Sequence, residues 1–127
     1  MACVSKEDKQ TIQNNIKPIL KKYGLKGSLR VNHSTEIVLI IRSGKLDLMA
    51  NYVDKYGYNR PYFSVNTYNI KSDFNDQNII DCMEQLHQAI LSANYFDHSD
   101  IMTDYVHVAY YYEIKVGEYN KPYLLNN

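Results

Sequence analysis

The feature that most constrains the fold is a run of strict alternation over residues 105–116. The even positions of this run are apolar or aromatic throughout, whereas Glu113 and Lys115 occupy odd positions. A side-chain period of two is typical of a strand that buries one face and exposes the other. We therefore expect a long strand over residues 105–116, which Gly117 ends or bulges.

The first third of the chain predicts one helix and a hairpin. Apolar residues recur at helical spacing from Ser5 to Tyr23, and Ser5 and Gly24 suit the two caps. Pro18 lies inside this helix and predicts a kink or a restart near Lys17.

Two strands should follow at residues 26–32 and 35–42, joined by a polar turn at residues 32–34. The second of these strands is apolar on both faces, which favours a central position in the sheet.

The middle of the chain contains one segment whose pattern fits two structures. Residues 45–56 fit either a short amphipathic helix or a loop that contains one helical turn. Residues 62–70 have strand composition, and Asn75 or Asp76 then caps a helix that extends to Ile90. The sum is one α+β domain over residues 1–127, with a mainly antiparallel sheet of about four strands and two main helices packed on one face.

The composition is that of a globular domain and not of a membrane-spanning protein. Hydrophobic residues make up 45% and charged residues 22% of the 127 positions, as in ordinary globular domains. The sequence contains no apolar run long enough for a membrane span and no apolar signal segment, so we expect a cytoplasmic protein. Cys3 and Cys82 suit neither a disulfide framework nor a metal knuckle.

A polar segment precedes the alternating run and is the best candidate for a chemical site. Its acids, hydroxyls and imidazoles are Asp97, His98, Ser99, Asp100, Thr103, Asp104 and His107. Such groups can bind a metal or move protons, and a metal-assisted hydrolase using Asp100, Asp104 and His107 is one hypothesis. The same residue types also complete turns by bonding nearby backbone amides, which is the simpler interpretation.

No catalytic signature supports the hydrolase hypothesis. The sequence has no HExxH pair, no phosphate-binding glycine loop and no GxSxG elbow. We therefore expect no metal and no cofactor, and a binding protein rather than an enzyme.

Tyrosine supplies the second constellation, with thirteen copies and no tryptophan. A tyrosine ring is apolar with one polar tip, so tyrosines on a sheet face can anchor a partner. Tyr105, His107 and Tyr111 share the face of the 105–116 strand that should be exposed, and Tyr62 or Tyr68 would lie on a neighbouring strand. These five residues form the predicted binding surface.

Charge is balanced overall but unevenly distributed. Residues 1–60 contain eleven Lys and Arg against five acids, whereas residues 61–127 contain three against nine. A basic patch can bind nucleic acid, although charged helix faces are commonly just solvated. The residues of this alternative site are Lys17, Lys21, Lys22, Lys26 and Arg30.

The two ends of the chain also resemble a known family. The run SDIMTDY with its tyrosine-rich strand and KPY, and the earlier run IKPILKKYGLKGSLRVNHSTEIVLIIRSGKLDL, are similar to the large polyvalent protein-associated domain family, the twenty-ninth of its series. The resemblance covers residues 16–123, except for residues 52–77, and Tyr119 stands where tryptophan is expected.

The resemblance implies a setting and no catalytic residue. Domains of this family occur in phages and conjugative elements, often as parts of very large proteins thought to accompany incoming DNA or to counter host defences. We expect a small phage or mobile-element accessory protein that acts in the host cytoplasm as a non-enzymatic binding module, with inhibition of a host or defence protein as one role. A homodimer that pairs two copies of the 105–116 strand is a further expectation.

Overall fold

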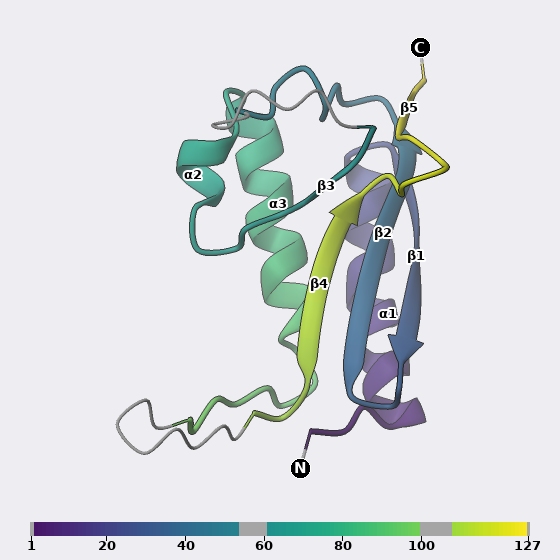
Figure 1. The fold of residues 1–127 in the computed structure, drawn as a ribbon, viewed down its shortest axis with the longest axis vertical. Helices are drawn as coiled ribbons and strands as arrows, with labels where there is room; N and C mark the ends of the chain where they lie inside the picture. The colour runs from purple at the N-terminus through teal and green to yellow at the C-terminus, as the bar shows by residue number, and fades with distance from the viewer. Residues whose placement is uncertain (1, 54–60, 100–107, 127) are drawn as a thin grey trace.

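The fold is a mixed sheet with helices on one side. The computed structural model describes residues 2–53, 61–99 and 108–126, and within them it has three helices and a five-stranded sheet (Figure 1). In chain order, the elements are α1 (Lys6–Lys22), β1 (Leu25–Asn32), β2 (Glu36–Gly44), β3 (Phe63–Ser64), α2 (Ile70–Asp73), α3 (Gln77–Ile90), β4 (Tyr111–Val116) and β5 (Leu124–Leu125).

The strand order is β1-β2-β4-β3, with β5 pairing the end of β2. The predicted α+β class is confirmed, but the sheet is mixed: β1–β2 and β3–β4 are antiparallel, whereas β2–β4 and β2–β5 are parallel. The parallel β2–β4 pair arises because the long connection through α3 brings the chain back beside β2 in the same direction.

The start of the chain folds as its local signals predict. Ser5 caps α1 in a reciprocal capping box with Asp8, and Gly24 follows the helix with φ of 68°. The helix runs through Pro18 as one element and does not restart there. Pro18 is exposed, so its ring meets solvent at the surface of the helix.

The β1–β2 hairpin places β2 in the centre of the sheet, as predicted. His33 and Ser34 have φ of 53° and 60°, and Thr35 N–H donates to the Asn32 carbonyl at 3.1 Å. Two successive positive φ values give the tight turn that joins strands with right-handed twist.

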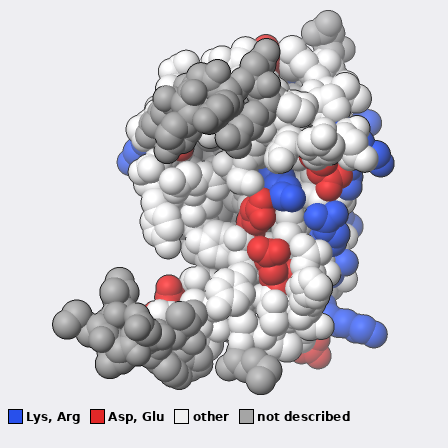
Figure 2. Space-filling model, in the orientation of Figure 1, with Lys and Arg blue, Asp and Glu red and all other residues white. Residues whose placement is uncertain are grey.

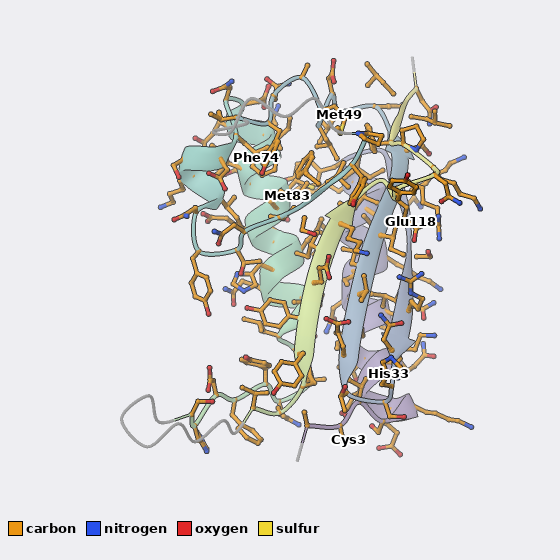
Figure 3. The ribbon with its side chains drawn as sticks, viewed as in Figure 1. Cys3, His33, Met49, Phe74, Met83 and Glu118 are labelled. Carbon is orange, nitrogen blue, oxygen red and sulfur yellow. The ribbon has the colours of Figure 1, made fainter. Side chains whose placement is uncertain are left out.

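Both main helices cover the same face of the sheet. Figure 1 shows α1 and α3 behind β1, β2 and β4. The odd positions of β2, such as Leu39, join α1 and α3 residues in one buried cluster. Met83 of α3 is fully buried in that cluster and Phe74 lies at its upper end (Figure 3).

The structure decides one open alternative and shortens two of the expected strands. Residues 45–53 form turns rather than a helix, which agrees with the loop alternative for this described part. The strand expected at residues 62–70 is reduced to Phe63–Ser64, because the Asn66 side chain accepts from Tyr68 N–H at 3.0 Å and turns the chain toward α2.

The last strand is also shorter than its alternation suggested. Within the described residues, β4 begins at Tyr111, and residues 105–107 lie outside those residues. Its alternation is confirmed, since Ile114 and Val116 are fully buried while Tyr111 is exposed. Gly117 ends the strand with φ of 75°, and β5 then follows without having been predicted.

Candidate functional site

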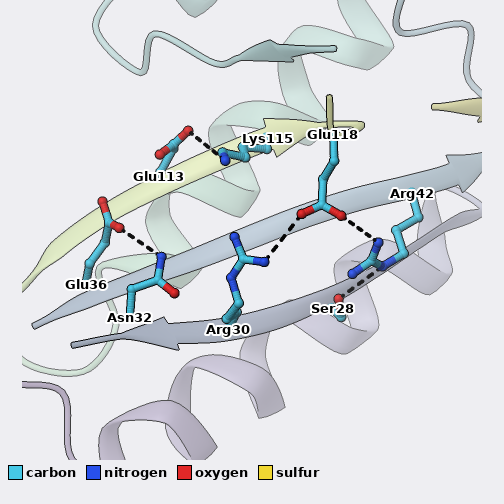
Figure 4. A network of polar contacts seen from close by, with 8 residues as sticks. All are labelled: Ser28, Arg30, Asn32, Glu36, Arg42, Glu113, Lys115 and Glu118. Atoms are coloured by element: carbon cyan, nitrogen blue, oxygen red, sulfur yellow. Dashed lines mark hydrogen bonds and ion pairs between the residues drawn. The ribbon is translucent and has the colours of Figure 1, made fainter. Parts of the chain in front are cut away.

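The sheet face away from the helices carries a network of charged side chains (Figure 4). Val38 and Ile40 of β2 point to this face, yet each is only 1% exposed. Their neighbours across the sheet include Arg30 and Lys115, whose aliphatic stems can cover apolar surface while their charges stay in water.

Glu118 is the centre of this network. Its two carboxylate oxygens accept from Arg30 at 3.4 Å and from Arg42 at 3.2 Å, so one acid joins β1 and β2. Partial desolvation works to raise the pKa of Glu118, but the hydrogen bonds and charges of Arg42 and Arg30 outweigh it and lower the pKa below its ordinary value. Lys121 N–H and Glu118 N–H each donate to the other residue's carbonyl, which holds Glu118 in a tight turn.

The rest of the open face is balanced in the same way. Glu113 accepts from Ser64 at 2.6 Å and lies 3.9 Å from the Lys115 ammonium, and Asn32 donates to Glu36 at 3.3 Å. Figure 2 shows the acids in the middle of this face with the bases beside them. Most charges at the centre of the face are therefore satisfied within the protein.

A second candidate lies where β4 meets α3. The Tyr112 hydroxyl is 3.1 Å from His87 Nε2 and 3.5 Å from Thr67 Oγ1, and the Tyr95 ring packs edge-on against Tyr112 at 5.6 Å. Burial lowers the pKa of His87, and the charge of Glu84 partly opposes this shift. These contacts hold Tyr112 and Tyr95 in defined positions.

Two further tyrosines of this region are exposed to solvent. Tyr68 is 88% exposed and Tyr111 is 47% exposed. Burial raises the pKa of Tyr95, and charge interactions with Tyr112, Asp97, Tyr68 and Tyr111 raise it further, so these four side chains lie within electrostatic reach of the Tyr95 hydroxyl. We name this set the tyrosine cluster, consisting of Tyr68, His87, Tyr95, Tyr111 and Tyr112.

The tyrosine cluster adjoins the start of β4, which has no paired strand on the side away from β2 in the part of the chain that the structure describes. Tyr111 N–H donates to Thr35 on the β2 side, so the main chain of Tyr112 points away from β2. Strand pairing on that other side is confined to Lys115 and Val116 in the described residues, followed by Val65 N–H donating to the Ile114 carbonyl. The first residues of β4 are therefore the available part of its edge, and the expected pairing of a longer strand across a dimer lies partly outside the described residues.

The predicted tyrosine surface is only partly assembled. Tyr68 and Tyr111 each lie within electrostatic reach of Tyr95, whereas Tyr62 makes a T-shaped ring contact with Tyr119 at 6.5 Å. Tyr105 and His107 lie outside the described residues. His87, Tyr95 and Tyr112 were not expected in a site, because contacts between separate elements bring them there and no local motif marks them.

The polar segment shows turn chemistry where it is described. Asp97 accepts from Ser99 N–H at 2.9 Å, and the backbone and side-chain hydrogen bonds of Ser99 lower the pKa of Asp97. The His98 ring stacks on Phe96 at 4.7 Å. Asp100 and Asp104 lie outside the described residues, and no group of three or more metal-ligating side chains occurs within residues 2–53, 61–99 and 108–126.

The predicted nucleic-acid residues are divided between the two sides of the sheet. Lys17, Lys21 and Lys22 are exposed on α1, which packs behind the sheet, and Lys26 is exposed near the start of β1. Arg30 instead belongs to the open face through its contact with Glu118. Arg42 and Glu118 join Arg30 there, although neither was a predicted site residue.

Comparison with known proteins finds no relative. No protein-family model, curated protein or solved structure matches the chain. Among the described helices, none has the length and apolar composition needed to cross a membrane.

Proposed function

We propose that this protein is a non-enzymatic binding module that holds a protein partner on the tyrosine cluster. The observation that carries the proposal is the exposure of Tyr68 and Tyr111 within electrostatic reach of Tyr95, together with the contacts that hold Tyr95 and Tyr112 in place. Exposed aromatic rings next to side chains that are already held in place commonly contribute most of the binding energy of protein interfaces.

The neighbouring strand edge supports the same function. A partner strand that runs beside β4 could exchange main-chain hydrogen bonds with Tyr112, while Tyr68 and Tyr111 contact its side chains. The contacts of Tyr112 with His87 and Thr67 reduce the ordering that binding would require. The cluster thus combines a directional contact with apolar area.

The resemblance described above suggests where to look for the partner. The resemblance implies a phage or mobile-element origin. The partner that the module would inhibit is then a protein of the host cell, including one used in defence. The partner search therefore belongs in a bacterial lysate.

The test is affinity capture with paired variants. Tagged wild-type protein, a Tyr68→Ala/Tyr111→Ala double variant and a Tyr119→Ala control are each incubated with nuclease-treated bacterial lysate, and bound proteins are identified by mass spectrometry. Tyr119 is a suitable control because it is 82% exposed but contacts Tyr62 rather than the tyrosine cluster. We expect a stoichiometric partner with wild type and with the control, and its loss from the double variant.

One outcome would contradict the proposal, and one would call for a second variant. Equal capture by all three proteins would remove the tyrosine cluster as the binding surface. A double variant with a lowered thermal midpoint would leave loss of capture open to a folding explanation, so Tyr68→Ser, at the most exposed tyrosine of the cluster, serves as a second variant and should reduce capture at unchanged stability.

A further inference from the structure

Charge is separated in space as well as along the chain. Residues 6–45, which contain α1, β1 and β2, carry nine Lys and Arg against three acids, whereas residues 61–99 carry one against five. Figure 2 shows the basic side chains gathered along the β1 side of the open face. This side of the molecule therefore presents positive potential to a partner.

One basic groove lies between the start of α1 and β1. It has a volume of about 420 Å³, and its cationic lining residues are Lys6, Lys9 and Arg30. Leu29 and Val31 form part of its apolar floor. Because β1 is the edge strand, no further strand of the described sheet covers this groove.

A second basic groove lies at the end of β2. It has a volume of about 410 Å³ and is lined by Arg42, Lys121, Pro122 and Leu124. Arg42 and Lys121 come from different parts of the chain, so the tertiary fold brings these two cations together.

Glu118 connects the two grooves. It binds Arg30 of the first groove and Arg42 of the second with opposite oxygens of one carboxylate. A carboxylate held between two guanidinium groups shows that their geometry suits an anion. We name the five cations Lys6, Lys9, Arg30, Arg42 and Lys121 the basic track, and Glu118 is the acid placed at its centre.

An exposed aromatic ring adjoins the track. Tyr119 follows Glu118 in the turn that also contains Lys121, and it is 82% exposed. Among the described residues its ring contact is the T-shaped one with Tyr62, and its high exposure leaves ring surface available for stacking. Cations that follow a backbone together with an exposed aromatic ring are the features of single-strand binding surfaces.

We infer that the basic track binds single-stranded nucleic acid, with phosphates paired to its cations and a base stacked on Tyr119. The surface is separate from the tyrosine cluster, so this inference goes beyond the proposed protein-binding function. Phosphates repeat along a strand and so match cations distributed over two grooves. A single acidic side chain would pair with only one of these cations.

Glu118 gives the inference a specific consequence. Because its carboxylate already occupies the two arginines, an incoming phosphate must displace it or accept repulsion from it. Glu118→Gln keeps the shape of the side chain and removes the charge, so it should bind nucleic acid severalfold more tightly. Glu113→Gln is the matched control, because Glu113 lies on the same face but contacts Ser64 and Lys115.

The experiment measures fluorescence anisotropy of a labelled single-stranded DNA of about 20 nucleotides over a salt series. For wild type, the logarithm of the binding constant should fall by about 0.7 per phosphate contact for each tenfold rise in salt concentration. Arg42→Ala should lessen this slope by about the value of one contact. Lys17→Ala, on the exposed side of α1, should leave the slope unchanged. Tyr119→Ala should weaken binding at every salt concentration.

Several results would overturn the inference. Absent or salt-independent binding would exclude the basic track, as would equal affinities for Glu118→Gln and Glu113→Gln. Tighter binding to a duplex of the same length together with an unaffected Tyr119→Ala variant would exclude the single-stranded ligand. Equal binding to polyglutamate would show that the surface takes acidic polypeptide instead.

Discussion

At the scale of single residues, Gly117 shows how one position can set the end of a strand. Its φ of 75° lies in the left-handed region, and a Cβ there would be 2.8 Å from Tyr123 N and 3.1 Å from the Pro61 carbonyl oxygen. Both neighbours are main-chain atoms that cannot easily move. Glycine is therefore required by conformation and by space.

We predict that Gly117→Ala lowers the free energy of unfolding by more than about 2 kcal/mol, because the left-handed conformation costs about 1–2 kcal/mol and the contacts add to it. Gly24→Ala is the matched control: it has φ of 68°, but its Cβ would meet the flexible Lys45 side chain at 3.0 Å. Urea unfolding of both variants measures the difference. A loss at Gly117 no greater than that at Gly24 would contradict the prediction.

At the scale of elements, α3 begins after the N-cap residue Asp76, which is recognisable in the sequence. The Asp76 carboxylate accepts from Asn78 N–H at 2.8 Å and from Ile79 N–H at 3.3 Å. These bonds satisfy donors that the first turn of any helix leaves without intrahelical partners. The same helix carries His87, so its stability also supports the tyrosine cluster.

We predict that Asp76→Ala lowers the free energy of unfolding by about 1 kcal/mol, whereas Asp76→Asn stays close to wild type because Asn caps equally well. Thermal and urea unfolding followed by circular dichroism measure both changes. Similar losses for the two variants would point to the charge of Asp76 rather than to its capping bonds.

Element lengths were less accessible from the sequence than element types. The β-branched and aromatic content of residues 62–70 suggested a strand, but Asn66 turns the chain after Ser64. Local turn chemistry therefore overrides strand propensity there. The odd and even positions of β4, by contrast, were assigned correctly because alternation depends only on which face is buried.

At the scale of the whole molecule, buried tyrosines join separate layers. Tyr110, 1% exposed, donates its hydroxyl to the Ile90 carbonyl at the end of α3 at 2.7 Å. Tyr123 donates to the Leu46 carbonyl at 2.6 Å. Burial, which is the largest cause, raises the pKa of each hydroxyl from 10.0 to about 12.

These shifts predict a loss of stability in alkali. A pKa raised in the folded state means that the folded protein holds its proton longer, so the stabilisation is complete below about pH 10 and is lost as pH rises toward 12. Cys82 acts in the same direction from about pH 9, because burial raises the pKa of its thiol to about 12.

Unfolding of Tyr110→Phe and wild type should be compared between pH 8 and pH 12. The variant should lose about 1 kcal/mol at pH 8 with its hydrogen bond, and it should lose less than wild type with each further pH unit above 10. Parallel curves for the two proteins would show that Tyr110 does not titrate differently in the folded and unfolded states.

The sequence by itself determined the features that arise from neighbours along the chain. The capping box at Ser5, the glycine after α1, the cap at Asp76 and the alternation of β4 all depend on residues a few positions apart, so the α+β class could be read from them. The tertiary structure alone decided the parallel pairing of β2 with β4, the meeting of Arg30 and Arg42 on Glu118, and the assembly of His87, Tyr95 and Tyr112. The physical reason is that these contacts join residues far apart in sequence, which come together only when the sheet buries its apolar face against α1 and α3.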